Sequence, residues 1–539
     1  MSGKPPRVQE EAGPGWRWAL RAATLFAVLA PVLLLDRYNS WYCFLGDEGV
    51  ILNGARRLLG GELPYRDFYS ILTPGSFYAL AAVFKVLGTS LFSARLALWG
   101  CHAATALLLL ALARELRLSE AWQTVGLCAL ALFGAPAWVA ASHHWFANVP
   151  LLLSAWLWLR DRGRGDFRLL AAAGATAALT ACTLQDKGTY WLAAVSLGMA
   201  LVPAPTRLRP LGAFWAGALA VALPAGGFFL WKAGLRVLVQ DLVVGPLARY
   251  HAGGLNQDAF GEAVVRTWTK LSAHLAAASG PRTALVLSRD LALGLDEVLL
   301  FGSVVLAGAL VLIGLVRRPA AGEPRRRFAV LAALAAASLG TLLHHPAGAG
   351  FFWALPGVLL LVLAAADRAA ARAPGRAWTG AAAVLVAVLA LPAAVRCLVD
   401  PLLDRGTVVR FPAGTVRVLD RREIETLRLA AAFRAADYRP GDRVYGYLYV
   451  PTLLFLLDLP PDGHYDLFLQ PLHTPEELRA HLAGLEADPP EWILYDRLRI
   501  PERDDVLAWI DARYRVVKVS DGLLVLRRRE ALVSPTPTP

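Results

Sequence analysis

The feature of this sequence best suited to chemistry is an adjacent pair of carboxylates, Asp47-Glu48. Two neighbouring carboxylates can act as a general base toward a hydroxyl or amine, or can hold a divalent cation. The pair follows the first apolar run directly and opens a loop that extends to Tyr78. A structural alternative is also open, because acidic residues at a helix N-terminus stabilise the helix dipole. We predict Asp47 and Glu48 as the catalytic residues.

Further polar residues are expected on the same face as this pair. Carboxylates beside cations at a lipid surface suit a substrate that is a lipid-linked phosphate, with a nucleophile brought alongside. The basic members of this face are Arg56, Arg57, Arg66, Lys187 and Arg249. The residues predicted to contact substrate are Tyr65, Arg66, Asp67, His143, His144, Lys187 and Arg249. No metal site or cofactor is predicted, although a divalent cation at Asp47 and Glu48 stays open as an alternative.

The composition is that of a protein embedded in a membrane. Of the 539 residues, 56% are hydrophobic and 18% are charged, and the mean hydropathy is +0.47. Too little polar surface is available to cover a water-soluble globule of this size. The formal charge of +12 comes from Lys and Arg in short clusters between apolar runs, which is typical of cytoplasmic loops and argues against nucleic-acid binding.

About eleven apolar runs are long enough to cross a hydrocarbon core. They lie at 18–35, 93–113, 121–141, 145–159, 168–184, 189–203, 209–231, 297–316, 327–343, 351–366 and 377–395. A further apolar stretch, 71–87, is ambiguous. If it stays on the outer surface as a juxtamembrane helix, every Arg-rich loop falls on the cytoplasmic side, as the positive-inside rule requires. We therefore predict that it does not span.

This orientation divides the chain into segments. A cytoplasmic tail (1–17) precedes a seven-span module (18–232) with an outer first loop (36–92). A large outer loop (233–296) and four further spans (297–396) follow. From 397 to 530 the composition is that of a soluble α/β domain, exported to the periplasmic side, and 531–539 is a disordered tail. Strands are predicted at 444–450 and 491–496, a hairpin over 515–529, and helices from Thr474 to Leu485 and from Pro501 to Tyr514.

The first part of the chain resembles the GT-C superfamily of multi-span glycosyltransferases, in particular the protein O-mannosyltransferases and the lipid A aminoarabinose transferase. The resemblance is carried by the acidic pair after the first span, by GELPYRDFYSILTPGSFYALAAVFKVLG, and by FSARLAL at the next span. It covers roughly residues 15–232 and the general layout of the C-terminal domain. It implies a polyprenyl-phosphate sugar donor, an acceptor deprotonated by Asp47, and inversion at the anomeric carbon. Lys187-Gly188 resembles a Lys-Gly pair of the aminoarabinose transferase, which would place a cation at the donor phosphate.

Two stretches depart from the pattern of that superfamily. Relatives often carry a second acidic residue at the outer end of the third span, where this chain has HHWFANVP. The aminoarabinose transferase has Glu-Lys-Pro before its juxtamembrane helix, where this chain has Leu72-Thr73-Pro74. His143 and His144 could replace the missing acid as a base or substrate ligand, or they could serve only as interfacial hydrogen-bonding residues.

The sequence therefore predicts a polytopic α-helical protein of the inner (plasma) membrane, with a small C-terminal α/β extracytoplasmic domain. The predicted function is an inverting glycosyltransferase that uses a polyprenyl-phosphate-linked sugar and a cell-envelope lipid, glycan or protein acceptor. The alternatives are a carrier (flippase) of lipid-linked sugars and a non-catalytic membrane protein of envelope assembly. The C-terminal domain is expected to be a lid or brace without chemistry of its own.

Overall fold

A computed structural model describes residues 46–131, 139–201, 208–249, 304–315, 323–344, 348–372, 406–418, 421–470, 473–497 and 505–529, with a few single residues elsewhere. The tails 1–17 and 531–539, almost all of the predicted span 18–35, and the predicted span 377–395 lie outside the described residues. Most of the predicted outer loop 233–296 also lies outside them, apart from its first part.

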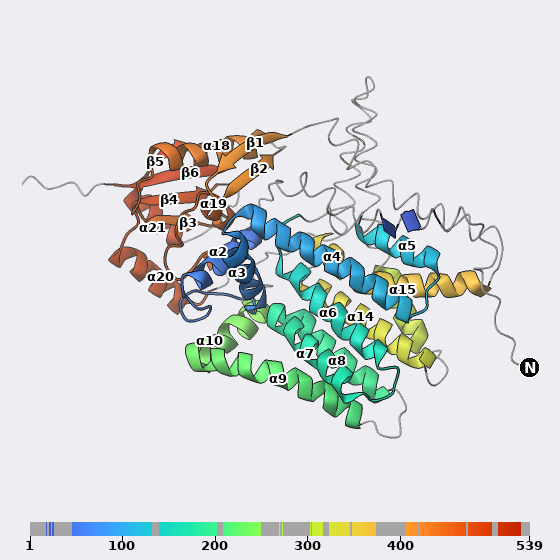
Figure 1. The fold of residues 1–539 in the computed structure, drawn as a ribbon. Helices are drawn as coiled ribbons and strands as arrows, with labels where there is room; N and C mark the ends of the chain where they lie inside the picture. The colour runs from blue at the N-terminus through green and yellow to red at the C-terminus, as the bar shows by residue number, and fades with distance from the viewer. Residues whose placement is uncertain are drawn as a thin grey trace, which may run out of the picture.

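The described chain forms a bundle of long helices with a smaller α/β part at one end (Figure 1). Between the two lie the helices of the predicted first loop. The helices up to residue 372 are α2 (Gly46–Leu59), α3 (Gly75–Leu87), α4 (Leu91–Glu115), α5 (Glu120–Ala129), α6 (His143–Arg160), α7 (Phe167–Thr183), α8 (Gln185–Leu201), α9 (Leu208–Ala233), α10 (Leu235–Val239), the π-helix η3 (Gln240–Arg249), 304–315, α14 (Glu323–His344) and α15 (Gly348–Arg372).

Most helices of the bundle coincide with the predicted apolar runs where the structure describes them. The run predicted at 121–141 is an exception, because α5 ends at Ala129 and residues 139–141 are not helical. Among the described helices, three are long and apolar enough to cross a membrane: Leu91–Glu115, Leu208–Ala233 and Trp353–Ala371. The helices α7 and α8 have 17 residues each, which at about 1.5 Å per residue is slightly shorter than a hydrocarbon core. The protein is therefore a helical membrane protein, and the number of spans stays a prediction.

The two helices of the first loop have informative starting points. The first begins at Gly46, so Asp47-Glu48 belongs to its first turn. Acidic residues are favoured there by the helix dipole. The second begins at Gly75, because a proline at 74 disfavours helical backbone at the residue before it. Its 13 residues reach about 20 Å, which is too short to span.

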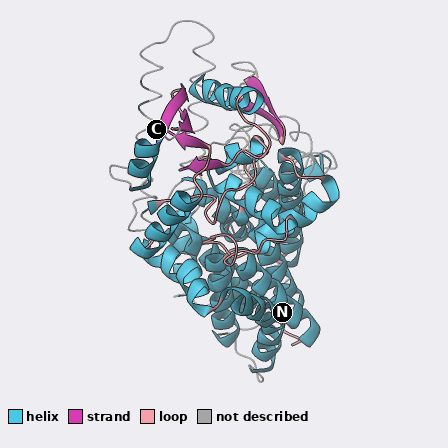
Figure 2. Cartoon of the chain, turned by 90° about the vertical axis from the view of Figure 1, so that its left-hand side faces the viewer, coloured by secondary structure: helices cyan, strands magenta, loops and turns pink. Residues whose placement is uncertain are grey.

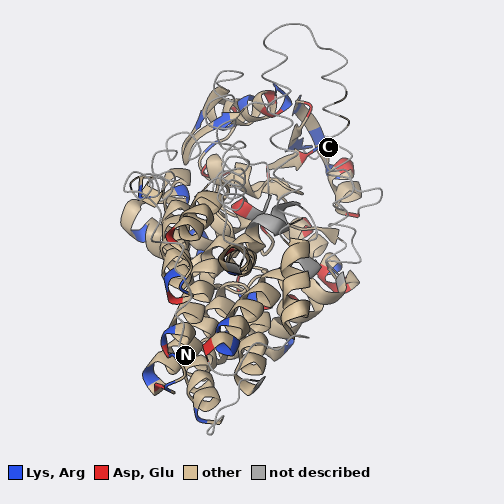
Figure 3. Ribbon diagram, turned by 90° about the vertical axis from the view of Figure 1, so that its right-hand side faces the viewer, with Lys and Arg blue, Asp and Glu red and all other residues tan. Residues whose placement is uncertain are grey.

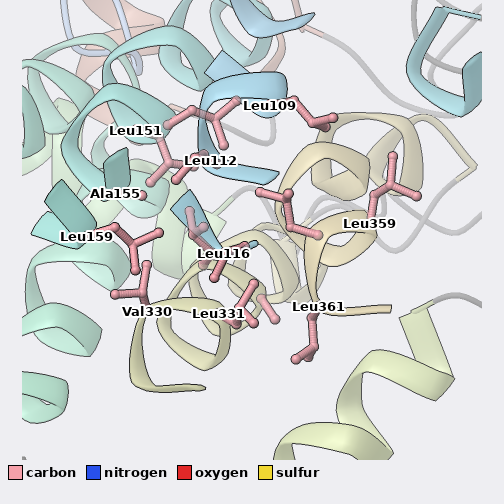
Figure 4. Close-up of a cluster of buried hydrophobic side chains, with 14 of the residues drawn as sticks. Leu109, Leu112, Leu116, Leu151, Ala155, Leu159, Val330, Leu331, Leu359 and Leu361 are labelled. Carbon is pink, nitrogen blue, oxygen red and sulfur yellow. The ribbon is translucent and has the colours of Figure 1, made fainter. Parts of the chain in front are cut away.

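The bundle core is built mainly from aliphatic side chains, and the part of it drawn in Figure 4 joins α4, α6, α14 and α15. Leucines of α4, α6 and α15 point toward one another and toward α14 in Figure 4. Leu109, Leu112, Leu152 and Leu334 are completely buried in this cluster. Most of the bundle is drawn without charged residues in Figure 3, and large apolar side chains such as Leu223 and Trp231 of α9 are exposed at its surface. An exposed apolar surface of this kind faces lipid in a membrane protein.

The α/β part carries its strands at the end of the molecule away from the bundle (Figure 2). A hairpin pairs β1 (Thr407–Phe411) with β2 (Gly414–Val418). The second sheet has the order β3-β4-β6-β5, in which β3 and β4 are parallel and the other pairs antiparallel. Its members are β3 (Val444–Tyr447), β4 (Trp492–Asp496), β5 (Tyr514–Val519) and β6 (Leu523–Arg528). Its helices are α18 (Arg421–Ala436), α19 (Pro451–Leu456), α20 (Pro475–Ala487) and α21 (Asp505–Arg513).

The predicted strands and helices of this part are confirmed, with changed ends. The strand predicted over 444–450 stops at Tyr447, since Leu448 takes a φ of +64° that a strand does not tolerate. The helix predicted from Thr474 begins with a complete capping box between Thr474 and Glu477. The strands β1 and β2 and the helices α18 and α19 were not predicted individually.

The α/β part shares a hydrophobic core with the first loop. Ile51 and Leu52 of α2 and Phe77 of α3 are completely buried together with Phe455 of α19. The rings of Phe84 and Phe455 stack with centroids 6.0 Å apart. Because this core is continuous across the junction, the α/β part is held by apolar burial and not only by a chain connection.

Candidate active site

Glu48, the second member of the acidic pair at the start of α2, is held in a buried ion pair. The Glu48 side chain is 0% exposed, and its carboxylate oxygens accept two hydrogen bonds of 2.6 Å from Arg95 of α4. One of these oxygens also accepts a hydrogen bond of 2.8 Å from the backbone N–H of Ala141. The side chain of Asp47 lies outside the described residues, while its backbone is in the first turn of α2.

These contacts give Glu48 a positioning role. A buried carboxylate is tolerated only when it is paired and fully hydrogen-bonded, as it is here. The pair joins the start of α2 to α4 and to the residues directly before α6. Asp47, the preceding residue, is thereby fixed on a rigid element, about 100° around the helix from Glu48. The Glu48 oxygens that a divalent cation would need are already engaged by Arg95, which weakens the alternative of a cation held by both carboxylates.

A close contact between α2 and α19 holds the α/β part against this helix. A Cβ atom at Gly49 would lie 2.0 Å from the backbone nitrogen of Thr452, so only glycine fits there. One turn later, the Asn53 side-chain amide donates a buried hydrogen bond of 3.0 Å to the carbonyl of Pro451. The same face of α2 that follows the acidic pair is therefore covered by the N-terminus of α19.

Arg57 connects the first loop to an irregular segment of the α/β part. Its guanidinium donates to Glu62 at 2.8 Å, to Asp466 at 3.1 Å and to the carbonyl of Gly463 at 2.9 Å. It also lies over the ring of Phe68, 4.8 Å from the centroid. The side chain is 4% exposed. Arg57, which was expected to face substrate, is thus engaged inside the protein, as is Arg56 with Asn53, Asp458 and the carbonyl of Leu459.

The structure places the predicted substrate contacts Tyr65, Arg66 and Asp67 in the scaffold of the first loop. Tyr65 is buried with a φ of +69°, and its hydroxyl donates to the carbonyl of Leu72 at 2.7 Å. Arg66 and Asp67 form a local ion pair at 2.6 Å, and Asp67 also accepts from the backbone of Leu63. The hydrogen bond from Arg66 holds the pKa of Asp67 below its usual value. None of the three lines the cavity described below.

Lys187 is also away from the cavity surface. It is completely buried, and its ammonium donates to Asn148 at 2.9 Å and to the carbonyl of Trp353 at 3.3 Å. These contacts tie α8 to α6 and α15. Arg249 ends η3, and its side chain lies outside the described residues. The expected cluster of cations open to substrate is therefore absent from the part of the site that the structure describes.

A cavity of about 490 Å³ opens where the first loop, α6, α8, η3 and the α/β part meet. Its apolar lining comes mainly from the first loop, η3 and the α/β part: Val50, Ile71, Leu72, Leu184, Leu242, Val243, Pro246, Leu247, Trp353, Leu467 and Leu469. Its polar lining is Tyr69, Ser70, His143, His144, Gln185, Asp186, Thr189, Tyr190, Tyr449 and Asp466. A cavity lined by both apolar and hydrogen-bonding side chains suits an amphipathic ligand.

Two of the predicted substrate contacts, His143 and His144, line this cavity. They open α6, where the Ser142 side chain caps the helix by accepting from the backbone of His144. The His144 ring stacks on Trp353 with centroids 3.6 Å apart, and the His143 ring lies 4.2 Å from that of His144. Stacking fixes the orientation of the two rings at the cavity wall.

Gln185 positions the first loop against α8. Its side-chain oxygen accepts from the backbone of Thr73 at 3.2 Å, and its amide nitrogen donates to the carbonyl of Ile71 at 2.6 Å. The stretch Leu72-Thr73-Pro74, which departs from the pattern of the aminoarabinose transferase, is thus a structural contact in this chain.

Two carboxylates in the cavity wall, Asp186 and Asp466, were not predicted as site residues. Asp186 lies in the first turn of α8. Asp466 comes from the segment between α19 and α20, about 400 residues after Asp47 in the chain. Asp186 had a sequence signal, because it stands in the outward Gln-Asp-Lys stretch. Asp466 had none, since only tertiary contacts bring it to the site. No group of three or more His, Cys, Asp or Glu side chains is arranged to hold a metal ion among the described residues.

Comparison with known proteins places this architecture. The fold is similar to that of ArnT from Cupriavidus metallidurans bound to undecaprenyl phosphate, with a TM-score of 0.50 and 14% identity over 97% of this chain and 100% of that one. The apo state of the same ArnT has a TM-score of 0.47 and 15% identity, over 97% of this chain and 99% of that one. The arabinofuranosyltransferase AftD from Mycobacteria has a TM-score of 0.49 and 14% identity, over 96% of this chain and 40% of AftD. Neither a family model nor a curated protein sequence matches this chain. The chain therefore shares its fold with ArnT, an aminoarabinose transferase of the kind that the sequence resemblance named.

Proposed function

We propose that this protein is an inverting glycosyltransferase of the inner membrane, which moves a sugar from a polyprenyl phosphate to an acceptor on the outer face. The observation that carries the proposal is the cavity between α8, η3 and the α/β part, which adjoins α2, the helix whose first turn contains Asp47. The likeness of the fold to ArnT, whose crystal structure contains undecaprenyl phosphate, supports the class of donor.

The apolar and the polar lining residues of the cavity suit the two parts of such a donor. Leu242, Val243 and Leu247 of η3 form an apolar surface for the first isoprene units of the lipid. His143 and His144 carry hydrogen-bonding groups of the kind that bind sugar hydroxyls. We place the scissile bond between these two groups of residues.

In the proposed reaction Asp47 is the general base. It removes the proton from an acceptor hydroxyl or amine, whose oxygen or nitrogen then attacks the anomeric carbon from the face opposite the phosphate. The bond between the anomeric carbon and the phosphate oxygen breaks, and its electron pair leaves with the polyprenyl phosphate. Because a phosphate is a stable leaving group, the chemistry needs no metal. Glu48 and Arg95 act through Asp47 by fixing the start of α2.

The charge that develops on the phosphate requires donors or cations in the transition state. Arg249, at the end of the cavity-lining helix η3, is the predicted residue whose position best suits this role. We assign Lys187 to positioning, because its ammonium is buried between Asn148 and Trp353. Its removal would leave these partners unsatisfied and disturb the packing of α6, α8 and α15.

The proposal is tested by assaying the purified full chain in detergent with undecaprenyl-phosphate-linked sugars and a crude extract of cell-envelope lipids and glycans. Release of undecaprenyl phosphate that depends on both donor and extract is expected. A chain that moves the donor across vesicle membranes without releasing undecaprenyl phosphate would be a carrier instead. Binding of neither donor nor extract would leave a non-catalytic assembly role.

A further inference from the structure

The α/β part contributes a carboxylate to the cavity that neither the predicted site nor the proposed reaction uses. Asp466 lines the cavity together with Tyr449, Leu467 and Leu469 of the same part. Its side chain is 7% exposed. Removing a charged carboxylate from water to this degree costs free energy unless a charged or hydrogen-bonding partner compensates for it.

The partner of Asp466 is held in place from several directions. Arg57 donates to its Oδ1 at 3.1 Å and is itself fixed by Glu62, by the carbonyl of Gly463 and by the ring of Phe68. Burial raises the pKa of the Asp466 carboxyl, while the neighbouring Arg57 opposes that rise. The carboxylate is therefore pre-organised, with Oδ1 directed to Arg57 and the side chain at the cavity wall.

The electrostatics of the cavity indicate which substrate part belongs next to Asp466. The described lining residues include the carboxylates Asp186 and Asp466 but no Lys or Arg. A phosphate placed against this wall would meet like charge. A hydroxyl or ammonium group would instead donate a charge-assisted hydrogen bond to a carboxylate, which is stronger than one between neutral groups.

We infer that Asp466 is an acceptor-binding residue, whose carboxylate accepts a hydrogen bond from a hydroxyl or ammonium group of the acceptor. This inference rests on the proposed glycosyl transfer and adds to it the substrate that this wall of the cavity takes. It also gives the α/β part a direct role in substrate recognition, in contrast to the expected lid or brace. The Arg57–Asp466 contact makes docking of the α/β part a condition for acceptor binding.

The test compares Asp466→Asn with the wild type in the full chain. Asparagine keeps the size and an oxygen for Arg57 but removes the charge. The amount of crude envelope extract needed for half-maximal release of undecaprenyl phosphate should rise roughly 10- to 100-fold, as expected for one hydrogen bond to a charged group. Binding of undecaprenyl phosphate alone, measured by native mass spectrometry, should stay within about twofold.

Asp458→Asn is the matched control. Asp458 belongs to the same part of the chain and also pairs with a first-loop arginine, Arg56 at 3.4 Å, but it is 61% exposed and does not line the cavity. This variant should saturate with extract like the wild type. Prior N-acetylation of the extract blocks amines and spares hydroxyls, so activity that survives it identifies a hydroxyl acceptor and activity that disappears identifies an amine.

If Asp466→Asn needs the same amount of extract as the wild type for half-maximal release of undecaprenyl phosphate, the inference is overturned. Tighter binding of undecaprenyl phosphate by that variant would also overturn it, because it would place Asp466 beside the donor phosphate. If Asp466→Asn melts at a lower temperature, Asp466→Glu keeps the charge and the Arg57 partner but displaces the carboxylate by one methylene. A folded Asp466→Glu should then bring the half-saturating amount of extract back toward the wild-type value, and a folded Asp466→Glu that behaves like Asp466→Asn would reject the role of the charge. A wild type that releases no undecaprenyl phosphate would refute the transferase itself before any variant is compared.

Discussion

Glu48 and Arg95 form a bidentate ion pair whose side chains are 0% and 1% exposed, and this pair fixes the first turn of α2, which also contains the proposed base. The hydrogen bonds of 2.6 Å from Arg95 and the added one from Ala141 engage both carboxylate oxygens of Glu48. We therefore expect the two neighbouring carboxylates, predicted as one catalytic unit, to have separate tasks, which mutation can distinguish.

Removing one partner of this pair should destabilise the protein strongly. Glu48→Gln leaves the Arg95 guanidinium buried without a counter-charge, and we expect a loss of up to about 3–5 kcal/mol in the free energy of unfolding. Replacing both by methionine should cost less than either single change, because no charge is then left unpaired. Unfolding titrations in detergent measure both. If the losses in unfolding free energy on changing Glu48 alone and Arg95 alone add up to the loss in the double replacement, the pair is not coupled.

Asp47→Asn should behave differently from Glu48→Gln. It removes the basic lone pair while keeping size, so turnover should fall on the order of 10²- to 10⁴-fold with donor affinity and melting temperature nearly intact. The readout is release of undecaprenyl phosphate at saturating extract, with and without a chelator. Wild-type turnover in Asp47→Asn would remove the catalytic assignment, and loss of wild-type activity on chelation would replace it with a metal site.

Gly49→Ala should loosen the α/β part from α2. The added methyl group meets the backbone of Thr452, which cannot move as a side chain can, and overpacking of this kind costs about 1–3 kcal/mol. Faster proteolytic release of the α/β part and a lower melting temperature are expected. Gly100→Ala on α4 is the control, because a Cβ atom there meets nothing within 4 Å and should be tolerated. Equal behaviour of the two variants would contradict the close contact.

Acidification should destabilise the α/β part through His481. Burial, together with His473 and His464 nearby, lowers the pKa of His481 from 6.5 to about 4. Between these values the unfolded chain binds a proton that the folded chain does not, so stability is full above about pH 6.5 and falls toward pH 4. Its loss amounts to a few kcal/mol at most.

The measurement is the melting temperature between pH 7.5 and 4.5. His481→Gln, which can keep a hydrogen bond to Tyr445, should flatten this dependence without abolishing it. Burial also lowers the pKa of His464, which therefore acts in the same direction. The raised pKa of Asp466 acts in the opposite one. A pH dependence that is identical in His481→Gln would refute this assignment.

The predicted orientation can be tested with cysteines introduced into a cysteine-free chain. An impermeant thiol reagent added from outside should label Glu62→Cys in the first loop and Arg479→Cys in the α/β part, whose side chains are 40% and 68% exposed. It should miss Gly163→Cys in the Arg-rich connection between α6 and α7. Labelling of Gly163→Cys alone would invert the topology and move the cavity to the cytoplasmic face.

The sequence predicted the elements of the fold better than the members of the site. Apolar runs and the Thr474 capping box are local signals, so α4, α9 and α20 occur where they were expected. Tyr65, Arg66 and Asp67 were chosen for their chemistry, but local hydrogen bonds already satisfy them. The sequence could not identify Asp466 as a site residue, because only its contact with Arg57, about 400 residues earlier in the chain, brings it to the cavity.

The shared wall of the cavity also has a consequence for biosynthesis. Ribosomes complete the bundle helices and the first loop long before they reach Tyr449 and Asp466, which form the other side of the cavity. Until the α/β part has been synthesised and packed onto α2, the cavity lacks Tyr449, Asp466 and their lining neighbours. The order of synthesis therefore completes the cavity only with the last-made part. Under the proposed function, an immature chain would have no full binding site for the acceptor and would leave the lipid-linked sugar unspent.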